Sequence, residues 1–238
     1  MDLIERFLSL VPTETEFWSA IVGAIVGGVI ALAVQLVAIH AASKQRREDR
    51  LEIQKTLGAS LIFKLIRIHT GIYGIHAHID GCLSSAKQRG LSGEPWQFVM
   101  PLINPPDHVH FNSEEMAMLL NLRDFNVFNA VLSLDVVHNS HIDSLRVLNT
   151  ERRALTDRLK AEEAVGTTLS GTLNYEQVML LKPKMIEVNT LIEQIQNKTK
   201  SDTSLAFDAL NSVSKLLREK LSLTYKIELD PARTPQTS

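Results

Sequence analysis

The side chains best placed to do chemistry in this sequence are His138 and His141, which lie three residues apart, with Asp135 three residues before His138. On a helix this spacing puts all three on one face, where imidazole and carboxylate groups can ligate a metal ion. The histidines also stand where an apolar residue is expected, and a buried imidazole can change its charge near neutral pH. They are therefore candidates for a metal site, for a pH-sensitive layer, or for plain hydrogen-bonded structure.

No other motif completes a catalytic arrangement. The sequence has no Gly-rich phosphate loop and no GxSxG or HExxH motif, and Cys82 is its single cysteine, so neither a CxxC pair nor an intramolecular disulfide can form. No catalytic residue and no cofactor is predicted.

The row that carries the two histidines is one of several apolar rows with alternating spacings of three and four, which is typical of helices packed in a bundle or coiled coil. Two long rows come first in the chain. They are Leu61, Leu65, Ile68, Ile72, Ile75, Ile79, Cys82 and Ala86, and then Val131, Leu134, His138, His141, Leu145, Leu148, Arg152, Leu155 and Leu159. Two shorter rows follow: Val178, Leu181, Met185, Val188, Ile192 and Ile195, and then Leu210, Val213, Leu217 and Leu221.

These rows predict an all-α domain with no strands. The expected helices span about 44–89, 113–163, 174–199 and 203–225. Between the first two lies a proline-rich loop over 90–111, whose apolar residues imply that it is ordered. Asn112 with Glu115 has the spacing of a capping box, which marks the start of the second helix.

The two longest helices have similar lengths, about 69 Å and about 76 Å at ~1.5 Å per residue. We therefore expect a long antiparallel hairpin with the loop at its tip and the shorter helices packed beside it. Gly58, Gly71 and Gly74 could instead break the first helix, although glycine in a helix also permits the close approach of a second one. Pro183 is expected to kink the third helix or to mark its first turn, and the tail 230–238 is expected to be disordered.

Residues 17–39 carry no formal charge and one polar amide, Gln35. As a helix this segment would be about 34 Å long, which is enough to cross a hydrocarbon core of about 30 Å. Its Phe, Ile, Leu and Val residues favour insertion by about 4 to 7 kcal/mol. The sequence therefore predicts one transmembrane helix after a short extracytoplasmic segment, 1–16.

Basic residues around this segment predict its orientation. Residues 1–16 contain one, Arg6, whereas residues 40–55 contain five, and Lys and Arg beside a span are retained in the cytoplasm. We expect a single-pass protein of the cell membrane with its N-terminus outside and a cytoplasmic helical domain over 40–229. A cleaved signal peptide is the competing interpretation, but the acidic leader and the long apolar run argue against it.

Small residues four apart form two rows on the predicted span, and such rows let transmembrane backbones approach closely. A homo-oligomer is therefore expected. The rows are Gly23, Gly27 and Ala31, and Ala20, Ala24 and Gly28.

Two classes of function are consistent with these features. The first is a membrane-anchored helical scaffold, transducer or effector that self-associates in the lipid bilayer and recruits an unidentified cytoplasmic protein partner. The second is a metal-dependent or otherwise catalytic helical bundle that uses His138, His141 and Asp135. Nucleic acid is not an expected partner, because the net charge is −2 and only 5% of residues are aromatic, which leaves neither a basic field nor a stacking surface.

Overall fold

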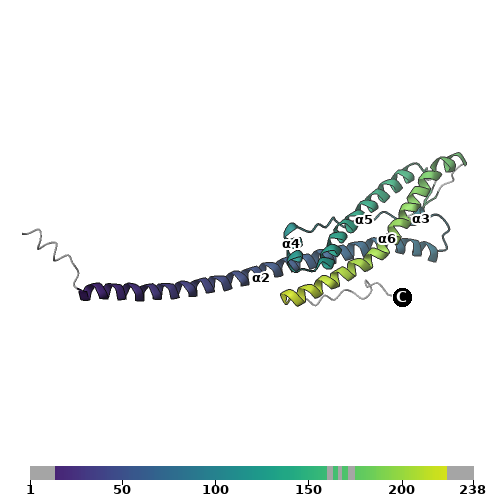
Figure 1. Ribbon diagram of the computed structural model, residues 1–238. Coiled ribbons are helices and arrows are strands. Elements are labelled where there is room, and N and C mark those ends of the chain that lie inside the picture. The colour runs from purple at the N-terminus through teal and green to yellow at the C-terminus, as the bar shows by residue number, and fades with distance from the viewer. Residues whose placement is uncertain (1–13, 160–162, 166–167, 171–174, 224–238) are drawn as a thin grey trace, which may run out of the picture. The chain divides into compact units, whose positions relative to one another are not determined.

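Long helices make up nearly all of this structure, a computed structural model that describes residues 14–159, 163–165, 168–170 and 175–223 (Figure 1). The chain divides into two compact units, Met1–Ile53 and Gln54–Ser238. For the described residues the predicted helical class is confirmed, apart from one short β ladder.

Three long helices carry the predicted rows: α2 (Glu14–Gln88), α5 (Phe125–Asp157) and α6 (Tyr175–Leu221). Two short helices, α3 (Pro95–Phe98) and α4 (Ser113–Asn121), lie in the connection between α2 and α5. Helix α2 continues without a break through all three of the glycines at which the sequence allowed an interruption.

The rows meet in two apolar cores inside the second unit, and α2, α5 and α6 contribute to both. Core 1 contains Leu61, Leu65, Ile68 and Ile72 of α2, Val127, Val131 and Leu134 of α5, and Ala206, Leu210, Val213 and Leu217 of α6. Core 2 contains Ile75 and Ile79 of α2, Leu145, Leu148 and Leu155 of α5, and Leu181, Val188, Ile192 and Ile195 of α6.

Within this unit α2 and α5 run in the same direction, so the predicted antiparallel hairpin of these two helices is wrong. From core 1 to core 2 the residue numbers rise along both α2 and α5, whereas they fall along α6. Helix α6 is therefore antiparallel to both. The cause lies in the connection, whose residues Trp96, Val99 and Val109 are buried in the cores. Because these side chains must be covered, the connection returns along the helices instead of forming a tip.

Side chains of α5 and α6 hold this returning connection by its backbone. The amide of Asn139 donates to the carbonyl of Val109 at 3.0 Å, and the N–H of Val109 donates to Oδ1 of Asn139 at 3.1 Å. Further along, the N–H of Trp96 donates to Oδ1 of Asn189 at 2.9 Å, and Nε of Arg152 donates to the carbonyl of Trp96 at 3.0 Å. These bonds satisfy backbone groups that would otherwise be costly to bury.

Helix α4 begins with the predicted capping box. The N–H of Glu115 donates to Oδ1 of Asn112 at 2.7 Å, and the N–H of Asn112 donates to Oε2 of Glu115 at 2.9 Å. The Glu115 carboxylate is fully buried and also accepts from Oγ of Ser60 at 2.6 Å and from Nζ of Lys64 at 2.7 Å. Burial alone raises the pKa of Glu115, but the bonds from Lys64, Ser60 and Asn112 outweigh it and hold the pKa below its usual value. One carboxylate thus both caps α4 and ties it to α2.

The helix predicted over 113–163 is interrupted and ends early. Arg123 has a φ of 59°, in the left-handed region that residues other than glycine rarely adopt. Asp124 then caps α5 by accepting a hydrogen bond from the N–H of Val127 at 3.1 Å. Helix α5 ends at Asp157. A row of apolar residues does not reveal such a break, because the core needs an apolar side chain on either side of it.

The two helices predicted over 174–199 and 203–225 are one helix, α6, which ends at Leu221. The buried Thr199 and Thr203 continue the row between the two predicted pieces. Each hydroxyl donates at 2.7 Å to the carbonyl oxygen four residues earlier, so the polar groups are satisfied within the helix and need not interrupt it. Pro183 also lies inside α6.

A short antiparallel ladder lies after α5 in the chain, in a region whose pattern predicts helix and turn. Strand β1 (Glu163–Val165) pairs with β2 (Thr168–Ser170), with Glu163 opposite Ser170. The β-branched residues Val165 and Thr168 favour extended backbone. The predictions for residues 1–13, 160–162, 166–167, 171–174 and 224–238 lie outside the described residues.

Candidate functional site

A layer of polar side chains separates core 1 from core 2. His138 and His141 of α5 lie between the two cores, and α6 contributes Thr199, Asp202 and Thr203 at the same level. We call these five residues the polar layer. All but Asp202 are buried. Both histidine side chains are therefore turned into the domain.

His138 is completely buried, with 0% of its surface exposed. Its Nε2 lies 3.2 Å from the carbonyl oxygen of Asp107, and because a carbonyl only accepts, Nε2 carries the proton. Its Nδ1 has no hydrogen-bond partner among the described residues. The imidazole is thus held with Nε2 as a donor to Asp107 and with Nδ1 buried without a hydrogen bond among the described residues.

Burial lowers the pKa of His138 below its usual value. Positive charge on His141, His108 and Arg67 acts in the same direction, and only the hydrogen bond to Asp107 opposes it. A second proton would sit on Nδ1, where the described residues offer no acceptor. Protonation of His138 therefore works against the folded state.

His141 has a different environment. Its Nε2 lies 2.7 Å from Oδ2 of Asp202, and the two side chains are 6% and 16% exposed. A carboxylate can only accept, so the imidazole N–H is the donor. This bond links α5 to α6 across the polar layer.

Asp135, the third predicted metal ligand, is not joined to either histidine. Its Oδ1 lies 3.3 Å from Nδ1 of His110 in the connection, without the geometry of a hydrogen bond. The described part of the chain contains no group of three or more His, Cys, Asp or Glu residues arranged to hold a metal ion. Among the described residues, His138 and His141 thus lie in the polar layer, and Asp135 does not join them in a group of metal ligands.

Sequence reasoning missed two partners of these histidines, Asp107 and Asp202. Both come from elements far away in the chain, so no local spacing could have indicated them. The glycines of α2 did indicate the close approach of a second helix. At Gly71 a Cβ atom would lie 2.8 Å from Cε1 of His138. At Gly58 a Cβ atom would lie 3.1 Å from Cδ1 of Leu223, but at Gly74 it would meet nothing within 4 Å.

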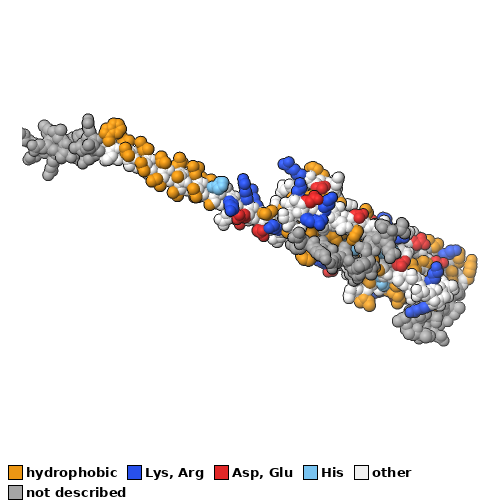
Figure 2. Space-filling view, turned by 90° about the horizontal axis from the view of Figure 1, so that it is seen from below, with side chains coloured by type: hydrophobic (Ala, Val, Ile, Leu, Met, Phe, Trp, Pro, Cys, Tyr) orange, Lys and Arg blue, Asp and Glu red, His pale blue; other side chains and the backbone are white. Residues whose placement is uncertain are grey.

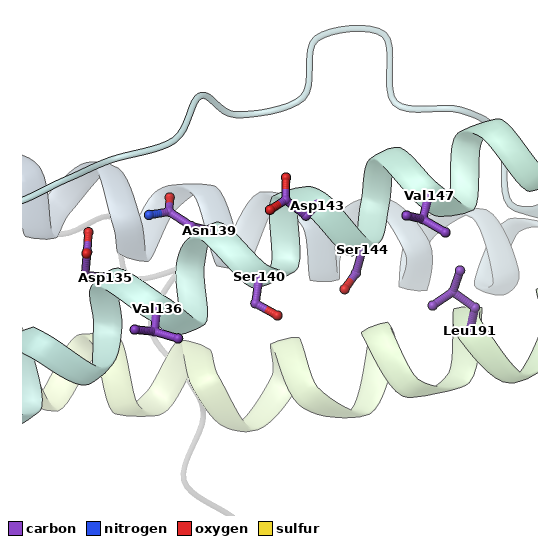
Figure 3. A pocket seen from close by; sticks show the side chains of 8 residues that line it. All are labelled: Asp135, Val136, Asn139, Ser140, Asp143, Ser144, Val147 and Leu191. Carbon is purple, nitrogen blue, oxygen red and sulfur yellow. The ribbon is translucent and has the colours of Figure 1, made fainter.

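A shallow groove of about 590 Å³ lies beside the polar layer, between α5 and α6 (Figure 3). Val136 and Val147 stand toward its two ends, with the small side chains of Ser140 and Ser144 between them, and Leu191 closes one side from α6. The remaining lining residues are Asp135, Asn139 and Asp143. The groove is open to solvent and does not enclose a small molecule.

The second candidate site is the apolar stretch of α2 over residues 17–39. From Val22 to Ile39 the large apolar side chains are between 51% and 70% exposed. We call residues 17–39 the apolar sleeve. On the face shown in Figure 2 its apolar side chains follow one another along the helix, and charged residues come after them. Near its N-terminus the chain thus has one helix that is long and apolar enough to cross a membrane. An exposed apolar surface of this extent marks a site of contact with a membrane or a partner.

The predicted small-residue rows lie on this sleeve. A Cβ atom placed on Gly23, Gly27 or Gly28 would meet nothing within 4 Å, and Ala24 and Ala31 are exposed. The side chain of Ala20 lies outside the described residues. The rows are therefore accessible to another helix in the described part of the first unit.

Comparisons of this chain with protein-family models, with curated proteins and with solved structures give no match.

Proposed function

We propose that this protein is a membrane-anchored helical scaffold or transducer. One transmembrane helix over 17–39 anchors it, its N-terminus lies outside the cell, and the helical domain from Gln54 onward lies in the cytoplasm. There it self-associates and binds a protein partner. The observation that carries the proposal is the exposed apolar sleeve of α2.

The free energy of insertion supports the anchor. Side chains of Phe, Ile, Leu and Val favour transfer from water to the bilayer by roughly 0.3 to 0.6 kcal/mol each, and the sleeve contains enough of them to exceed the modest cost of Gln35 and its glycines. Trp18 at one end, whose ring centroid lies 6.2 Å from that of Phe17, is of the type that collects at the membrane interface. Lys44, the first Lys or Arg beyond the other end, supports cytoplasmic retention of the helical domain.

Two treatments of membranes from cells that express the full chain test the anchor and its orientation. A carbonate wash should leave the protein in the membrane pellet, and a reporter that is active only in the cytoplasm, fused after Ser238, should be active. Release by carbonate would overturn the anchor. Activity only of an extracytoplasmic reporter would overturn the orientation, and a mature chain that begins after residue 40 would identify a signal peptide.

Self-association is tested by substitution within the sleeve. Gly27→Leu puts a large side chain into the small-residue row, whereas Val29→Leu adds bulk on the opposite side of the helix. Crosslinking of the full chain in membranes should give oligomers that Gly27→Leu reduces and Val29→Leu preserves. Equal crosslinking in both variants would exclude the small-residue row as the contact.

The partner is sought by crosslinking and affinity capture from the cells that make the protein, because its identity is not encoded in any motif. A chain that ends at Ile53 is the matched control. Proteins captured by the full chain and not by the control belong to the helical domain. Capture of the same proteins by both chains would count against a partner of the domain.

A further inference from the structure

The charged residues beyond the apolar sleeve are separated onto two sides of α2. At 100° per residue, Lys44, Arg46, Arg47 and Arg50 fall within an arc of about 160°, and the acidic residues fall within an arc of about 100° on the other side. These acidic residues are Glu48, Asp49 and Glu52. All seven side chains are exposed, and Lys44 and Glu48, which stand where the two sides meet, lie 3.9 Å apart. We call the first set the basic face and the second the acidic face.

The orientation of the helix in the membrane does not by itself require that basic and acidic residues occupy different sides of α2. The positive-inside effect depends on how many Lys and Arg residues flank a span, not on which side of the helix they occupy. Opposite charges three or four residues apart can neutralise one another on a helix, and on the basic face Lys44 forms such a pair, with Glu48. In the described part of the chain, Arg46, Arg47 and Arg50 form no ion pair, so they remain available to an external anion.

The basic face begins at the outer edge of the headgroup region and continues beyond it. Lys44 and Arg50 lie 5 and 11 residues after Ile39 in the chain, which is about 8 and about 17 Å beyond the sleeve at ~1.5 Å per residue. The headgroup layer occupies roughly the first 5 to 8 Å outside the hydrocarbon core. Long Lys and Arg side chains extend back toward the interface, so that Lys44 reaches the lipid phosphates and the arginines lie within about 10 Å of them, a distance at which charges still attract at 0.1 M salt.

We infer that the basic face binds the phosphate groups of anionic lipids in the adjacent leaflet, and that the acidic face is turned away from them. This inference depends on the proposed membrane anchor. Arg recognises phosphate through two parallel N–H donors, and each basic residue near an anionic surface strengthens binding about fivefold. A helix that tilts from the membrane normal brings one side closer to the headgroups, and the basic face is the side favoured there.

The acidic face of a second copy is the competing partner. The position of the small residues argues against it, because by helical periodicity Gly23, Gly27 and Ala31 lie on the same side as the acidic face. Two parallel helices that associate through these small residues would bring their acidic faces together. Their basic faces would then point outward to lipid.

A charge exchange tests the inference with the number of charges held constant. The double substitution Arg47→Glu with Glu52→Arg keeps the net charge and the count of basic residues, and so keeps the topology signal. It places a positive charge within the acidic face and a negative charge within the basic face. The single substitution Arg47→Lys is the matched control that keeps the faces but removes the two-donor geometry.

The full chain is reconstituted into phosphatidylcholine vesicles that contain about one-fifth phosphatidylserine. Spin-labelled phosphatidylserine and spin-labelled phosphatidylcholine then report the fraction of each lipid that the protein immobilises. We expect the native chain to prefer phosphatidylserine, the exchanged chain to lose that preference about tenfold or more, and Arg47→Lys to lose it only in part. Added salt should weaken the preference of the native chain.

A native chain that immobilises both lipids equally would overturn the inference, and so would an exchanged chain that keeps the full preference. Loss of crosslinked oligomers in the exchanged chain, without any lipid preference in the native one, would assign the basic face to a second copy instead. A chain that carbonate removes from the vesicles would show failure of the anchor itself. That result is distinct from a chain that stays inserted and shows no lipid preference.

Discussion

Gly71 of α2 faces the imidazole of His138 on α5 so closely that a Cβ atom on Gly71 would lie 2.8 Å from Cε1 of that ring. The glycine is therefore the means by which a fully buried histidine fits between two parallel helices. Its absence of a side chain is required by sterics and not by backbone conformation, because α2 is helical throughout this region.

The first prediction concerns this contact. Gly71→Ala should lower the free energy of unfolding by about 1 to 2 kcal/mol, since overpacking costs about 1 to 3 kcal/mol and exceeds the gain in helix propensity. Gly74→Ala is the matched control, one turn away, where a Cβ atom meets nothing within 4 Å. That variant should be more stable than the native chain by about 0.5 to 1 kcal/mol. Chemical unfolding of the full chain in detergent micelles measures both.

A double-mutant cycle checks the cause. If the ring of His138 is the obstacle, His138→Ala should remove most of the penalty of Gly71→Ala, with a coupling energy of at least about 0.5 kcal/mol. Additive effects would mean that Gly71 is needed for some other reason, such as the nearby Pro106, whose Cβ would lie 3.4 Å away.

The second prediction concerns pH. Burial lowers the pKa of His138, so the unfolded chain binds the proton more readily than the folded one. The stability that this histidine contributes is present above the unfolded pKa of about 6.5 and is lost as the pH falls below it toward the folded value. Between pH 7 and pH 5 the loss should be at most about 2 kcal/mol.

His138→Gln removes the titrating group and retains an N–H that can donate to the carbonyl of Asp107. Its free energy of unfolding should therefore depend less on pH between 7 and 5 than that of the native chain. His141→Leu should instead destabilise the protein, because it leaves Oδ2 of the Asp202 carboxylate without its donor. A native pH profile in His138→Gln would disprove the pH-sensitive role.

The third prediction concerns the buried carboxylate of α4. Glu115→Gln should cost about 2 to 3 kcal/mol, because a buried group that accepts from Ser60, Lys64 and Asn112 loses its charge. Lys64→Met should destabilise the protein at least as much, because it leaves the fully buried carboxylate of Glu115 without its charged donor.

The same carboxylate gives a second pH dependence with a different range. Its pKa is lowered in the folded state, so its contribution is present above the ordinary carboxyl pKa of about 4.5 and is lost as the pH falls through the folded value. Thermal unfolding between pH 5 and pH 3 should show a steeper loss of stability in the native chain than in Glu115→Gln. Parallel curves would show that Glu115 titrates in the same way folded and unfolded.

The fourth prediction concerns the break between α4 and α5. Arg123 adopts a φ of 59°, a conformation that costs a residue with a Cβ atom about 1 to 2 kcal/mol. Arg123→Gly should raise the free energy of unfolding by roughly 0.5 to 1 kcal/mol, after the greater flexibility of glycine in the unfolded chain is subtracted. The control Arg153→Gly, at an exposed position inside α5, should lower it by about 1 kcal/mol.

The sequence was sufficient to predict the features that depend on periodicity. The rows on α2 and α5 are buried where a spacing of three and four places them, except for Cys82, Arg152 and Leu159, which are partly buried, and the capping box at Asn112 is formed. Helix direction was predicted wrongly, because two helices of similar length fit a hairpin in either direction and only the packing of Trp96 and Val109 decides between them. Thr199 was a second source of error, since a polar residue in a row suggests an end unless its hydroxyl bonds within the helix.

The candidate site was predictable only in part. His138 and His141 stand out because they occupy positions in a row where apolar residues are expected, and this can be recognised from the sequence alone. Their partners, the carbonyl of Asp107 and the carboxylate of Asp202, come from the connection and from α6, at sequence separations of 31 and 61 residues. Spacing carries no information about contacts of that range.

The parallel arrangement of α2 and α5 has a consequence for synthesis on the ribosome. Helix α6 supplies residues up to Ile195 to core 2 and up to Leu221 to core 1, so core 2 cannot be completed before Ile195 has been made and core 1 not before Leu221. At about 5 to 20 residues per second, the ~130 residues between the end of α2 and that point take roughly 7 to 27 s. During this interval the apolar row of α2 has been translated but is not yet fully covered by the rest of the domain.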